Sequence, residues 1–486
     1  MARNGVMIAG LTSGSGKTLL TLGLLRACAK RGLPVSAAKT GPDFIDAGFL
    51  TAAIGQPAVN LDGFAMSPRM LAQLATNQPG ETVIVEAVMG LCDGGAGGVG
   101  SSVAVADALN LPIILVVDVR HTAQTAAMVA AGLNKLLPKS PIAGVVLNRV
   151  ASPRHHALIS AALDDVQLPL LGALPSDETL QIPSRHLGLV QAGDLADCGQ
   201  LDPVLVSAAE FVEAHCDIAA ILRLAGALPP PAAPAAGLLP PPAQNIAIAK
   251  DAAFGFCYAH MMQGWRHQGA RITLFSPLND EAPAADAEFV FIPGGYPELH
   301  LPALTQAHKC FSGLRRAAAD GYLIYGECGG FMMLGTAITG ADGNAYKMAG
   351  LLDLHTSFAS PKRHLGYRRF TPKTKFFWPG TLLGHEFHYS SAVKQLGPAL
   401  FDAKDASGAA LGEPSVVERS TQRQLMGRGC MDMQQMKAEL KLRRSESRGV
   451  HVQGLTEKRL TTAKELLQLL AKAEANRVTA ATRLNA

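Results

Sequence analysis

Near-continuous apolar segments alternate with helix-length patterns along the first half of this chain. The apolar segments are Val6–Ala9, Val83–Glu86, Ile113–Asp118 and Ala143–Leu147. Strands that are buried on both faces have this composition. Helical patterns lie between them, over Leu19–Lys30 and Thr122–Leu137. Alternating strands and helices predict an α/β fold with a parallel sheet covered by helices.

Proline is concentrated in one segment, LAGALPPPAAPAAGLLPPPAQ. Proline at this density cannot continue a helix or pair in a central strand, so the segment predicts a semi-rigid linker. Strand-like segments resume after it, at 246–249, 289–292 and 323–325. A chain of 486 residues, 48% of them hydrophobic, can fill two or three cores. We therefore predict two α/β domains, residues 1–223 and 245–413, joined by a linker over 224–244.

The last segment, residues 414–486, has a different composition. It holds 14 Lys and Arg against 7 Asp and Glu and contains no aromatic residue of the Phe, Tyr or Trp type. Its leucines show helical spacing between 461 and 470. A basic tail can bind nucleic acid or an acidic surface. We interpret this tail as an appendage that is disordered or partly helical. The rest of the chain is slightly acidic, so we predict no nucleic-acid partner.

Composition argues against export and against a membrane location. Eight cysteines are scattered without a CxxC pair, and no secretory signal pattern follows Met1. No apolar run approaches the ~20 residues that span a bilayer. We predict a cytoplasmic protein in a reducing compartment. The oligomeric state stays open, with a homodimer as one alternative.

A glycine-rich segment, GLTSGSGKT, lies between the first strand and the first helix. Glycines at 10, 14 and 16 allow backbone N–H groups to surround a phosphate at a helix N-terminus. Lys17 would then reach the terminal phosphates and the Thr18 hydroxyl would bind Mg²⁺. The usual pattern has its first glycine one residue later, where Leu11 stands. The order of strand, loop and helix still predicts a P-loop.

Acidic residues at strand ends can hold the metal that accompanies a bound nucleotide. Glu86 ends the segment TVIVE, and Asp93 follows it on a glycine-rich loop. Asp118 ends another apolar segment, where a metal role and a capping role remain alternatives. KTGPDFID places a lysine and two aspartates within eight residues. This combination suits the activation of a carboxylate with ATP, which needs cations for phosphate and carboxylates for Mg²⁺.

The chain resembles the cobyrinic acid a,c-diamide synthase family, which includes hydrogenobyrinic acid a,c-diamide synthases, in five successive motifs: GLTSGSGKT, KTGPDFID, VEAVMGLCDGG, LNRVASPRHH and GALPSDETLQIPSRHLGLV. The resemblance spans residues 4–413. It implies a P-loop domain similar to dethiobiotin synthetase, followed by a class I glutamine amidotransferase domain. At Phe44 the family usually has tyrosine.

The resemblance also implies site residues and cofactors, with ATP and Mg²⁺ required. ATP would be bound by Gly14, Ser15, Gly16, Lys17, Thr18, Lys39 and Asn148. Mg²⁺ would be held by Thr18, Glu86 and Asp43. Asp43 and Asp93 would serve the activation of the substrate carboxylate.

Two motifs of the second half predict a glutaminase site. FIPGGYPELH and YGECGGFMML both follow apolar strands. In class I amidotransferases a cysteine stands on a strained strand-to-helix turn, and nearby backbone N–H groups stabilise the oxyanion. Cys328 is thus the predicted nucleophile. The predicted oxyanion groups are Gly294, Gly295 and Gly329.

The base for this cysteine is not identified by the sequence. The family carries its histidine in a Gly-Ser-aromatic-x-His segment near the C-terminus, and residues after Glu413 contain no such segment. The change in composition there suggests a shifted reading frame or a replaced ending. The remaining candidates are His385, His388 and His451.

Together these features predict amidation of the a- and c-carboxylates of a corrin, with glutamine as donor and an acyl phosphate as intermediate. The missing histidine predicts that ammonia is used well and glutamine poorly. The alternatives are a cobyric acid synthase acting on other corrin side chains, a P-loop switch ATPase and a protein without catalytic activity.

Overall fold

The computed structural model describes residues 3–177, 180, 191–230, 239–378 and 380–411, and the backbone of five strands between residues 415 and 453. The chain forms two compact units, Met1–Lys437 and Ala438–Ala486. The second unit contains an antiparallel pair of strands, β23 (Lys441–Ser445) and β24 (Gly449–Gln453). The first unit contains both predicted α/β domains. The predicted helical stretch 461–470 lies outside the described residues.

A mostly parallel sheet organises the first half of the chain. Its strands are β1 (Asn4–Gly10), β2 (Val35–Thr40), β3 (Val59–Leu61), β4 (Thr82–Glu86), β5 (Ile113–Asp118), β6 (Ile142–Val150), β7 (Leu170–Pro175) and β8 (Gly226–Ala227). The order is β3-β2-β4-β1-β5-β6-β7, with β8 antiparallel to β1. The four apolar segments predicted as strands are β1, β4, β5 and β6, so the parallel α/β architecture is confirmed.

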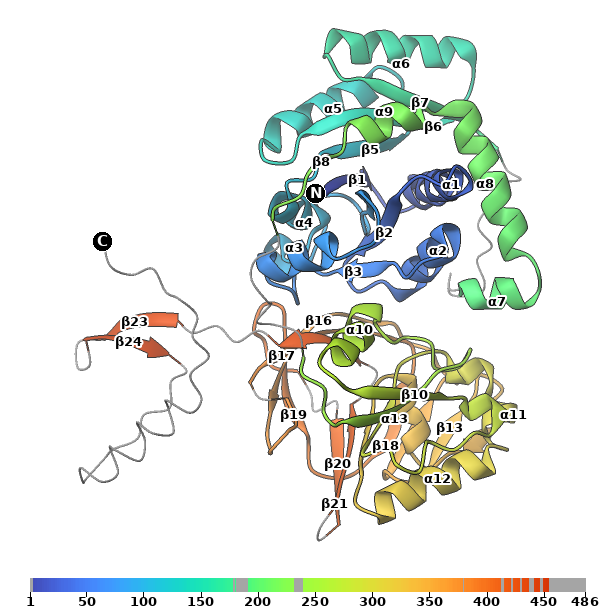
Figure 1. Cartoon of the computed structure of the whole chain (residues 1–486), viewed down its shortest axis with the longest axis vertical. Coiled ribbons are helices and arrows are strands. Elements are labelled where there is room, and N and C mark those ends of the chain that lie inside the picture. The colour runs from blue at the N-terminus through green and yellow to red at the C-terminus, as the bar shows by residue number, and fades with distance from the viewer. Residues whose placement is uncertain are drawn as a thin grey trace. The chain divides into compact units, whose positions relative to one another are not determined.

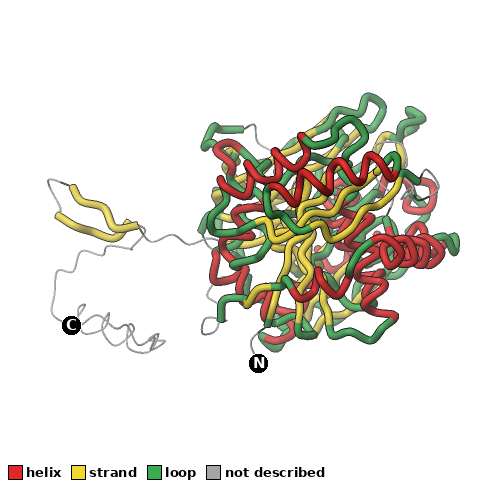
Figure 2. Tube along the Cα trace, turned by 90° about the horizontal axis from the view of Figure 1, so that it is seen from above, coloured by secondary structure: helices red, strands yellow, loops and turns green. Residues whose placement is uncertain are grey.

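Helices cover both faces of this sheet (Figure 1). They are α1 (Lys17–Lys30), α2 (Phe44–Ile54), α3 (Pro68–Thr76), η1 (Ala96–Gly98), α4 (Ser102–Leu109), α5 (Thr125–Leu136), α6 (Pro153–Asp165), α7 (Ala192–Asp197), α8 (Leu201–His215) and α9 (Ile218–Arg223). Apolar residues of α1, α2 and α8 form one buried cluster. Those of α3 and α4 form a second cluster on the opposite face. In Figure 2 the strands lie between flanking helices.

Local sequence explains where several of these helices begin and end. Asp43 caps α2 by accepting hydrogen bonds from the backbone of Ile45 and Asp46. Gly55, with φ 74°, ends the same helix in the left-handed conformation that glycine adopts readily. Ser67 caps α3, and Pro68 occupies its first position.

The second half is built on another sheet, with the order β10-β9-β11-β12-β21-β20. Its strands are β9 (Asn245–Ala249), β10 (Arg271–Phe275), β11 (Phe289–Ile292), β12 (Leu323–Gly326), β20 (Ser415–Ser420) and β21 (Arg423–Arg428). The helices of this half are α10 (Ala259–His267), η3 (Pro277–Asn279), η4 (Pro297–Leu299), α11 (Leu301–Leu304), α12 (His308–Ala319) and α13 (Gly329–Leu334). β9, β11 and β12 are the three strands predicted here.

Two smaller sheets complete the first unit. Their strands are β13 (Ala337–Thr339), β14 (Ala345–Lys347), β15 (Leu354–Ser357), β16 (His364–Pro372), β17 (Leu382–His388), β18 (Ser391–Gln395), β19 (Phe401–Asp405) and β22 (Met431–Met436). β16 and β17 are antiparallel neighbours in the sheet β19-β16-β17-β22. The strands β20 to β22 fall within residues 414–486, and the domain boundary at residue 413 stays a prediction.

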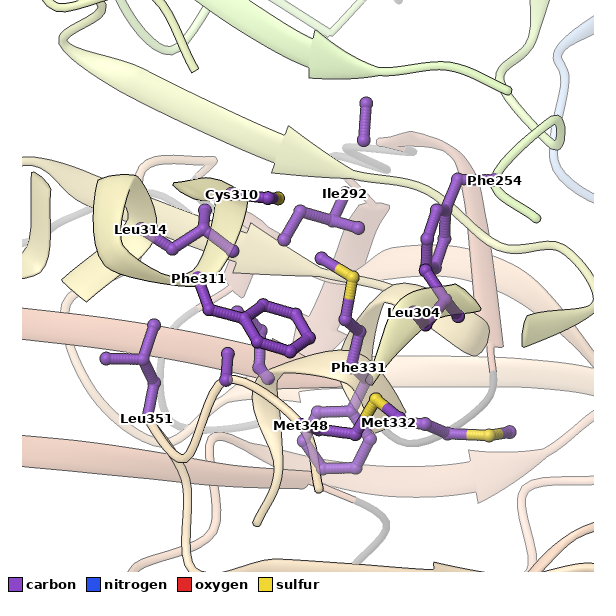
Figure 3. Packing of buried hydrophobic residues seen from close by; sticks show 14 of the residues in the cluster. Phe254, Ile292, Leu304, Cys310, Phe311, Leu314, Phe331, Met332, Met348 and Leu351 are labelled. Carbon is purple, nitrogen blue, oxygen red and sulfur yellow. The ribbon is translucent and has the colours of Figure 1, made fainter. Parts of the chain in front are cut away.

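The predicted nucleophile, Cys328, belongs to a buried apolar core. Phe331 and Met332 of α13 pack with Phe311 and Met348 in this core (Figure 3). The helix that follows Cys328 is therefore fixed by apolar packing. None of the described helices is both long and apolar enough to cross a membrane.

Candidate active site

Two glycines with positive φ shape the loop between β1 and α1. Gly14 has φ 76° and Gly16 has φ 100°. A Cβ on Gly16 would lie 2.1 Å from Nδ2 of Asn148, so a side chain there would displace Asn148. Asn148 itself donates a hydrogen bond to the carbonyl oxygen of Ser15 at 2.9 Å. In this conformation Asn148 supports the loop, and its predicted contact with a nucleotide base stays a prediction.

Lys17 is the first residue of α1, and its side chain is folded back over the loop. Its Nζ donates a hydrogen bond to the carbonyl oxygen of Thr12 at 2.9 Å. Burial, followed by the positive charge of Lys39, lowers the pKa of this ammonium group. The loop thus holds a buried cation at the position where the sequence predicts a phosphate.

Three charged side chains and one hydroxyl meet at the carboxyl ends of β1, β2 and β4. Lys39 and Glu86 are register partners on adjacent strands, and Lys39 Nζ lies 2.9 Å from Glu86 Oε1. Lys39 Nζ also lies 2.5 Å from Asp46 Oδ2. Thr18 Oγ1 donates to Glu86 Oε1 at 2.6 Å. The structure therefore brings together Thr18, Lys39 and Glu86, which the sequence predicted as site residues.

Asp46 is a member of this cluster that the sequence analysis did not assign. It follows the capping residue Asp43 by three positions, so one turn of α2 directs it toward Lys39. Burial raises the pKa of the Asp46 carboxyl, but the charge of Lys39 outweighs this effect and the net pKa is lowered. The spacing of the two aspartates in KTGPDFID was the only available signal.

The other pKa values in the cluster follow from burial and charge. Burial lowers the pKa of Lys39, but the charges of Glu86 and Asp46 outweigh it, and the net pKa is raised. Burial raises the pKa of Glu86. Burial, with the charge of Asp46, raises the pKa of Asp43 to about 7.

Asp43 and Asp46 line a cavity of about 500 Å³ whose walls come from both halves of the chain. The second half contributes Tyr296, Tyr367 and His385, among other residues. Asp93 lies on the loop beside this cavity, where its Oδ2 accepts a hydrogen bond from the backbone of Gly90 at 3.0 Å. Asp43 and Asp93, the two residues predicted to serve activation of the substrate carboxylate, thus lie in or beside the same cavity.

Asp118 belongs to a different cluster, on the other side of β1. Its Oδ2 lies 2.9 Å from Arg120 Nη2 and 2.7 Å from Arg149 Nη1. Arg149, which the sequence analysis did not single out, also donates to the carbonyl oxygen of Gly14 at 3.0 Å. These ion pairs favour a structural role for Asp118 over a metal role.

Cys328 stands on a strained turn between β12 and α13. Its φ is 48° and its ψ is −115°, a conformation that non-glycine residues rarely adopt. The side chain is buried, with 5% of its surface exposed. A Cβ on the adjacent Gly329 would lie 2.7 Å from Pro297 and 3.3 Å from the carbonyl oxygen of Gly295. The turn that follows β11 therefore approaches the cysteine turn closely, as the predicted oxyanion groups require.

A small cavity of about 30 Å³ lies beside Cys328. Its lining includes Tyr296, Glu298, His388 and Tyr389. His385 lines the larger cavity instead, where burial lowers the pKa of its imidazole to about 4. The structure thus separates two of the candidate bases. The third, His451, has its backbone in β24 and its side chain lies outside the described residues.

Three aromatic side chains line both cavities: Phe256, Tyr296 and Phe387. Phe256 and Tyr296 pack edge to face, with their ring centroids 5.1 Å apart. Burial raises the pKa of Tyr296, and negative charge at Glu298, Cys328 and Asp43 adds to the effect. Tyr296 therefore lies between the predicted nucleophile Cys328 and the Asp43 carboxylate. It is part of FIPGGYPELH, but no role was predicted for this tyrosine.

Comparison with known protein families identifies both halves. The CobQ/CobB/MinD/ParA nucleotide binding domain matches residues 6–190. The CobB/CobQ-like glutamine amidotransferase domain matches residues 245–428. The two domains therefore occur in the predicted order.

Three known proteins are similar to this chain over most of their length. Hydrogenobyrinate a,c-diamide synthase of Rhizobium meliloti (strain 1021) is 45% identical over 420 residues, which cover 86% of this chain and 97% of the relative. The protein of the same name from Sinorhizobium sp is 47% identical over 84% of this chain and 95% of the relative. The one from Rhodobacter capsulatus is 46% identical over 85% and 95%. The predicted resemblance is thereby confirmed, and the chain belongs to the hydrogenobyrinate a,c-diamide synthase family.

Proposed function

We propose that this chain is an ATP-dependent carboxylate–amine ligase that amidates the a- and c-side chains of hydrogenobyrinate, or of cobyrinate, with glutamine as the nitrogen donor. Family membership and the two matched domains support this assignment. The observation that carries it is the aromatic wall shared by the two cavities. Asp43 and Asp46 lie on one side of this wall and Cys328 lies on the other.

ATP would bind with its phosphates on the loop from Gly14 to Thr18. A phosphate there would replace the Thr12 carbonyl as the partner of Lys17. Lys39, held between Glu86 and Asp46, supplies a second fixed cation. Asn148 and Ser15 would hold the loop in place during binding.

Mg²⁺ would be held by Thr18, Glu86 and Asp43, and these oxygen ligands suit a hard cation. Among the described residues, Glu86 Oε2 is buried and has no hydrogen-bond partner. When bound, the metal would offset negative charge on the phosphates. We expect Glu86→Gln to raise the Mg²⁺ concentration needed for half-maximal activity. An unchanged Mg²⁺ requirement would mean that another residue, and not Glu86, binds the metal.

Amidation would then proceed in two displacements. A carboxylate oxygen of the substrate attacks the γ-phosphorus of ATP. The bond between this phosphorus and the bridging oxygen breaks, and ADP leaves with its electron pair. The nitrogen of ammonia attacks the resulting acyl phosphate, and inorganic phosphate leaves. Ammonia must lose a proton as this bond forms, and a carboxylate of the site that does not hold the metal would accept it. Asp93 would help to position the substrate carboxylate.

Glutamine would supply the ammonia in the second half. The Cys328 thiolate attacks the side-chain amide, while backbone N–H groups near Gly294, Gly295 and Gly329 stabilise the oxyanion. Ammonia leaves, and water releases glutamate from the thioester. The shared wall of Phe256, Tyr296 and Phe387 gives the ammonia a short path that is shielded from water and so from protonation.

The test is direct. The purified chain is incubated with hydrogenobyrinate, ATP and Mg²⁺, with glutamine in one series and ammonium chloride in another. We expect a product with two added amides, identified by mass spectrometry, in a reaction that requires ATP. Amides on other side chains would indicate the cobyric acid synthase type of reaction. ATP-dependent dimerisation without any amide would indicate a switch ATPase.

A further inference from the structure

The antiparallel strands β16 and β17 bring together four polar side chains beside the Cys328 cavity. His364 and His388 are register partners, and their rings stack with centroids 4.6 Å apart. Glu386 precedes His388 by two residues, which places both on the same face of β17. Glu386 Oε1 lies 2.9 Å from His388 Nε2. The fourth member is Arg368 on β16.

Arg368 keeps Glu386 ionised. Its Nε and Nη2 both donate to Glu386 Oε2, at 2.7 Å and 2.5 Å. Burial raises the pKa of Glu386, but the hydrogen bonds from His388 and Arg368 outweigh this effect and the net pKa is lowered. Because Arg368 occupies one carboxylate oxygen, the other is directed at His388. An ionised carboxylate at this distance stabilises a positive charge on the imidazole.

The second nitrogen of His388 also faces an acceptor. Nδ1 lies 3.1 Å from the backbone carbonyl oxygen of Ser390, closer than the 3.4 Å to the Ser390 hydroxyl. A carbonyl and a carboxylate both accept hydrogen bonds, so donation to both requires a proton on each ring nitrogen. The arrangement therefore favours an imidazolium. Its ring also lines the cavity that contains Cys328, together with Glu298, Tyr296 and Tyr389.

We propose that His388, held as a cation by Glu386, stabilises the thiolate of Cys328 and takes the role that the histidine of the Gly-Ser-aromatic-x-His segment has in the family. The inference rests on the proposed glutaminase role of Cys328. A nearby histidine cation is an established way of activating a cysteine. In glutamine hydrolysis the sulfur–carbon bond forms, the carbon–nitrogen bond breaks, and the leaving nitrogen takes the proton of the imidazolium, which becomes neutral imidazole.

The first experiment measures the thiolate directly. Alkylation of Cys328 by iodoacetamide is followed from pH 5 to pH 9 in the full chain, by mass spectrometry of the peptide that contains this residue. An ordinary thiol has a pKa of ~8.5. We expect a midpoint below this value in the wild type and an upward shift of about one pH unit or more in His388→Gln, with at least about tenfold slower alkylation at pH 7. Glu386→Gln should shift it in the same direction.

The matched control is His385→Gln, because His385 stands on the same strand but lines the other cavity. Its alkylation profile should match the wild type. Unchanged alkylation in both His388→Gln and Glu386→Gln would overturn the proposal. Ammonia-dependent amidation reports on the other half and should be kept in His388→Gln and Glu386→Gln. If the wild type made no amide from either nitrogen source, the proposed function would fail, while the thiol profiles would still decide the role of His388.

Chemical rescue separates a charge role from a structural one. Glutamine use by His388→Gly should recover when imidazole is added, since a cation can re-enter the cavity, and failure to recover would count against the proposal. The nitrogen and oxygen atoms of His364, Glu386 and His388 also lie within 4.8 Å of one another, a spacing that a metal could bridge. Stoichiometric Zn²⁺ binding that His364→Gln abolishes would make this cluster a metal site and would overturn the proposal.

Discussion

The charged side chains at the predicted phosphate site are mostly buried, and they form ion pairs with one another. Lys39 is 2% exposed and Glu86 is fully buried, and a buried charge is tolerated only when it is paired. Lys39 bonds two carboxylates at once, and Thr18 bonds one of them. Removing one partner would leave an uncompensated charge. Lys17 differs, because its partner is a neutral carbonyl that a phosphate can replace.

Lys17→Ala is therefore expected to remove ATP-dependent amidation with ammonia as well as with glutamine. Losing a cation that stabilises the transferred phosphoryl group should lower the rate by roughly 10²-fold or more. Initial rates with saturating ammonium chloride measure the effect. Lys30→Ala, at the exposed end of the same helix, is the control and should keep its activity. Normal ammonia-dependent turnover in Lys17→Ala would show that Lys17 does not bind the transferred phosphate.

Asp62 gives the fold a predictable pH dependence. It is fully buried after β3, where it accepts hydrogen bonds from the backbone of Phe64 and Ala65, and burial raises its pKa from 3.8 to about 6. Between these values the folded state binds more protons than the unfolded state. Stability from this group is thus present below pH 4 and is lost as the pH rises through 6, by at most about 3 kcal/mol.

Asp62→Asn keeps the acceptor oxygen and cannot ionise. We expect its melting temperature to rise relative to the wild type as the pH increases from 4.5 to 7.5, with little difference at the acidic end. Thermal unfolding followed at several pH values measures this. Parallel curves for the two proteins would mean that the Asp62 carboxyl has the same pKa in both states.

At the scale of elements, β16 connects the two halves of the first unit. Tyr367 of this strand stacks on Phe64, with ring centroids 4.4 Å apart. Its ring fills the space beside Gly100, where a Cβ would lie 2.7 Å from the Tyr367 hydroxyl. The glycine-rich loop that carries Asp93 is thus held by a residue more than 250 positions later in the chain.

A pair of glycine substitutions isolates this contact. Gly97 and Gly100 have nearly equal φ values of 73° and 75°, but a Cβ on Gly97 would meet nothing within 4 Å. Both alanine variants carry the cost of the left-handed conformation, about 1 kcal/mol. Gly100→Ala should therefore lower the melting temperature more than Gly97→Ala. In a Tyr367→Ala background the two losses should become equal, and a persistent difference would point to another contact.

Elements with continuous apolar segments were predictable from sequence, whereas contacts between distant elements were not. Ile113–Asp118 and Phe289–Ile292 are strands with the predicted bounds, since burial on both faces leaves a local signal. β16 (HLGYRRFTP) and β17 (LLGHEFH) contain no continuous apolar segment of this kind and were not predicted. The faces of β17 decide that His388 reaches the Cys328 cavity and His385 does not, and the pairing that orients them depends on residues far away in the chain.

At the scale of the whole molecule, two cavities with different chemistry meet at one aromatic wall. A substitution in one cavity should therefore remove the reaction of that cavity and leave the reaction of the other. Cys328→Ala is expected to remove glutamine-dependent amidation and to leave ammonia-dependent amidation within about twofold of the wild type, because no group of the synthetase cavity is changed. Cys310→Ala is the matched control, since Cys310 is also buried in the same core and does not line either cavity. Rates with each nitrogen source, together with glutamate release, measure both outcomes. Loss of both activities in Cys328→Ala, with normal rates in Cys310→Ala, would mean that the strained turn at Cys328 is needed for the fold rather than for glutamine hydrolysis.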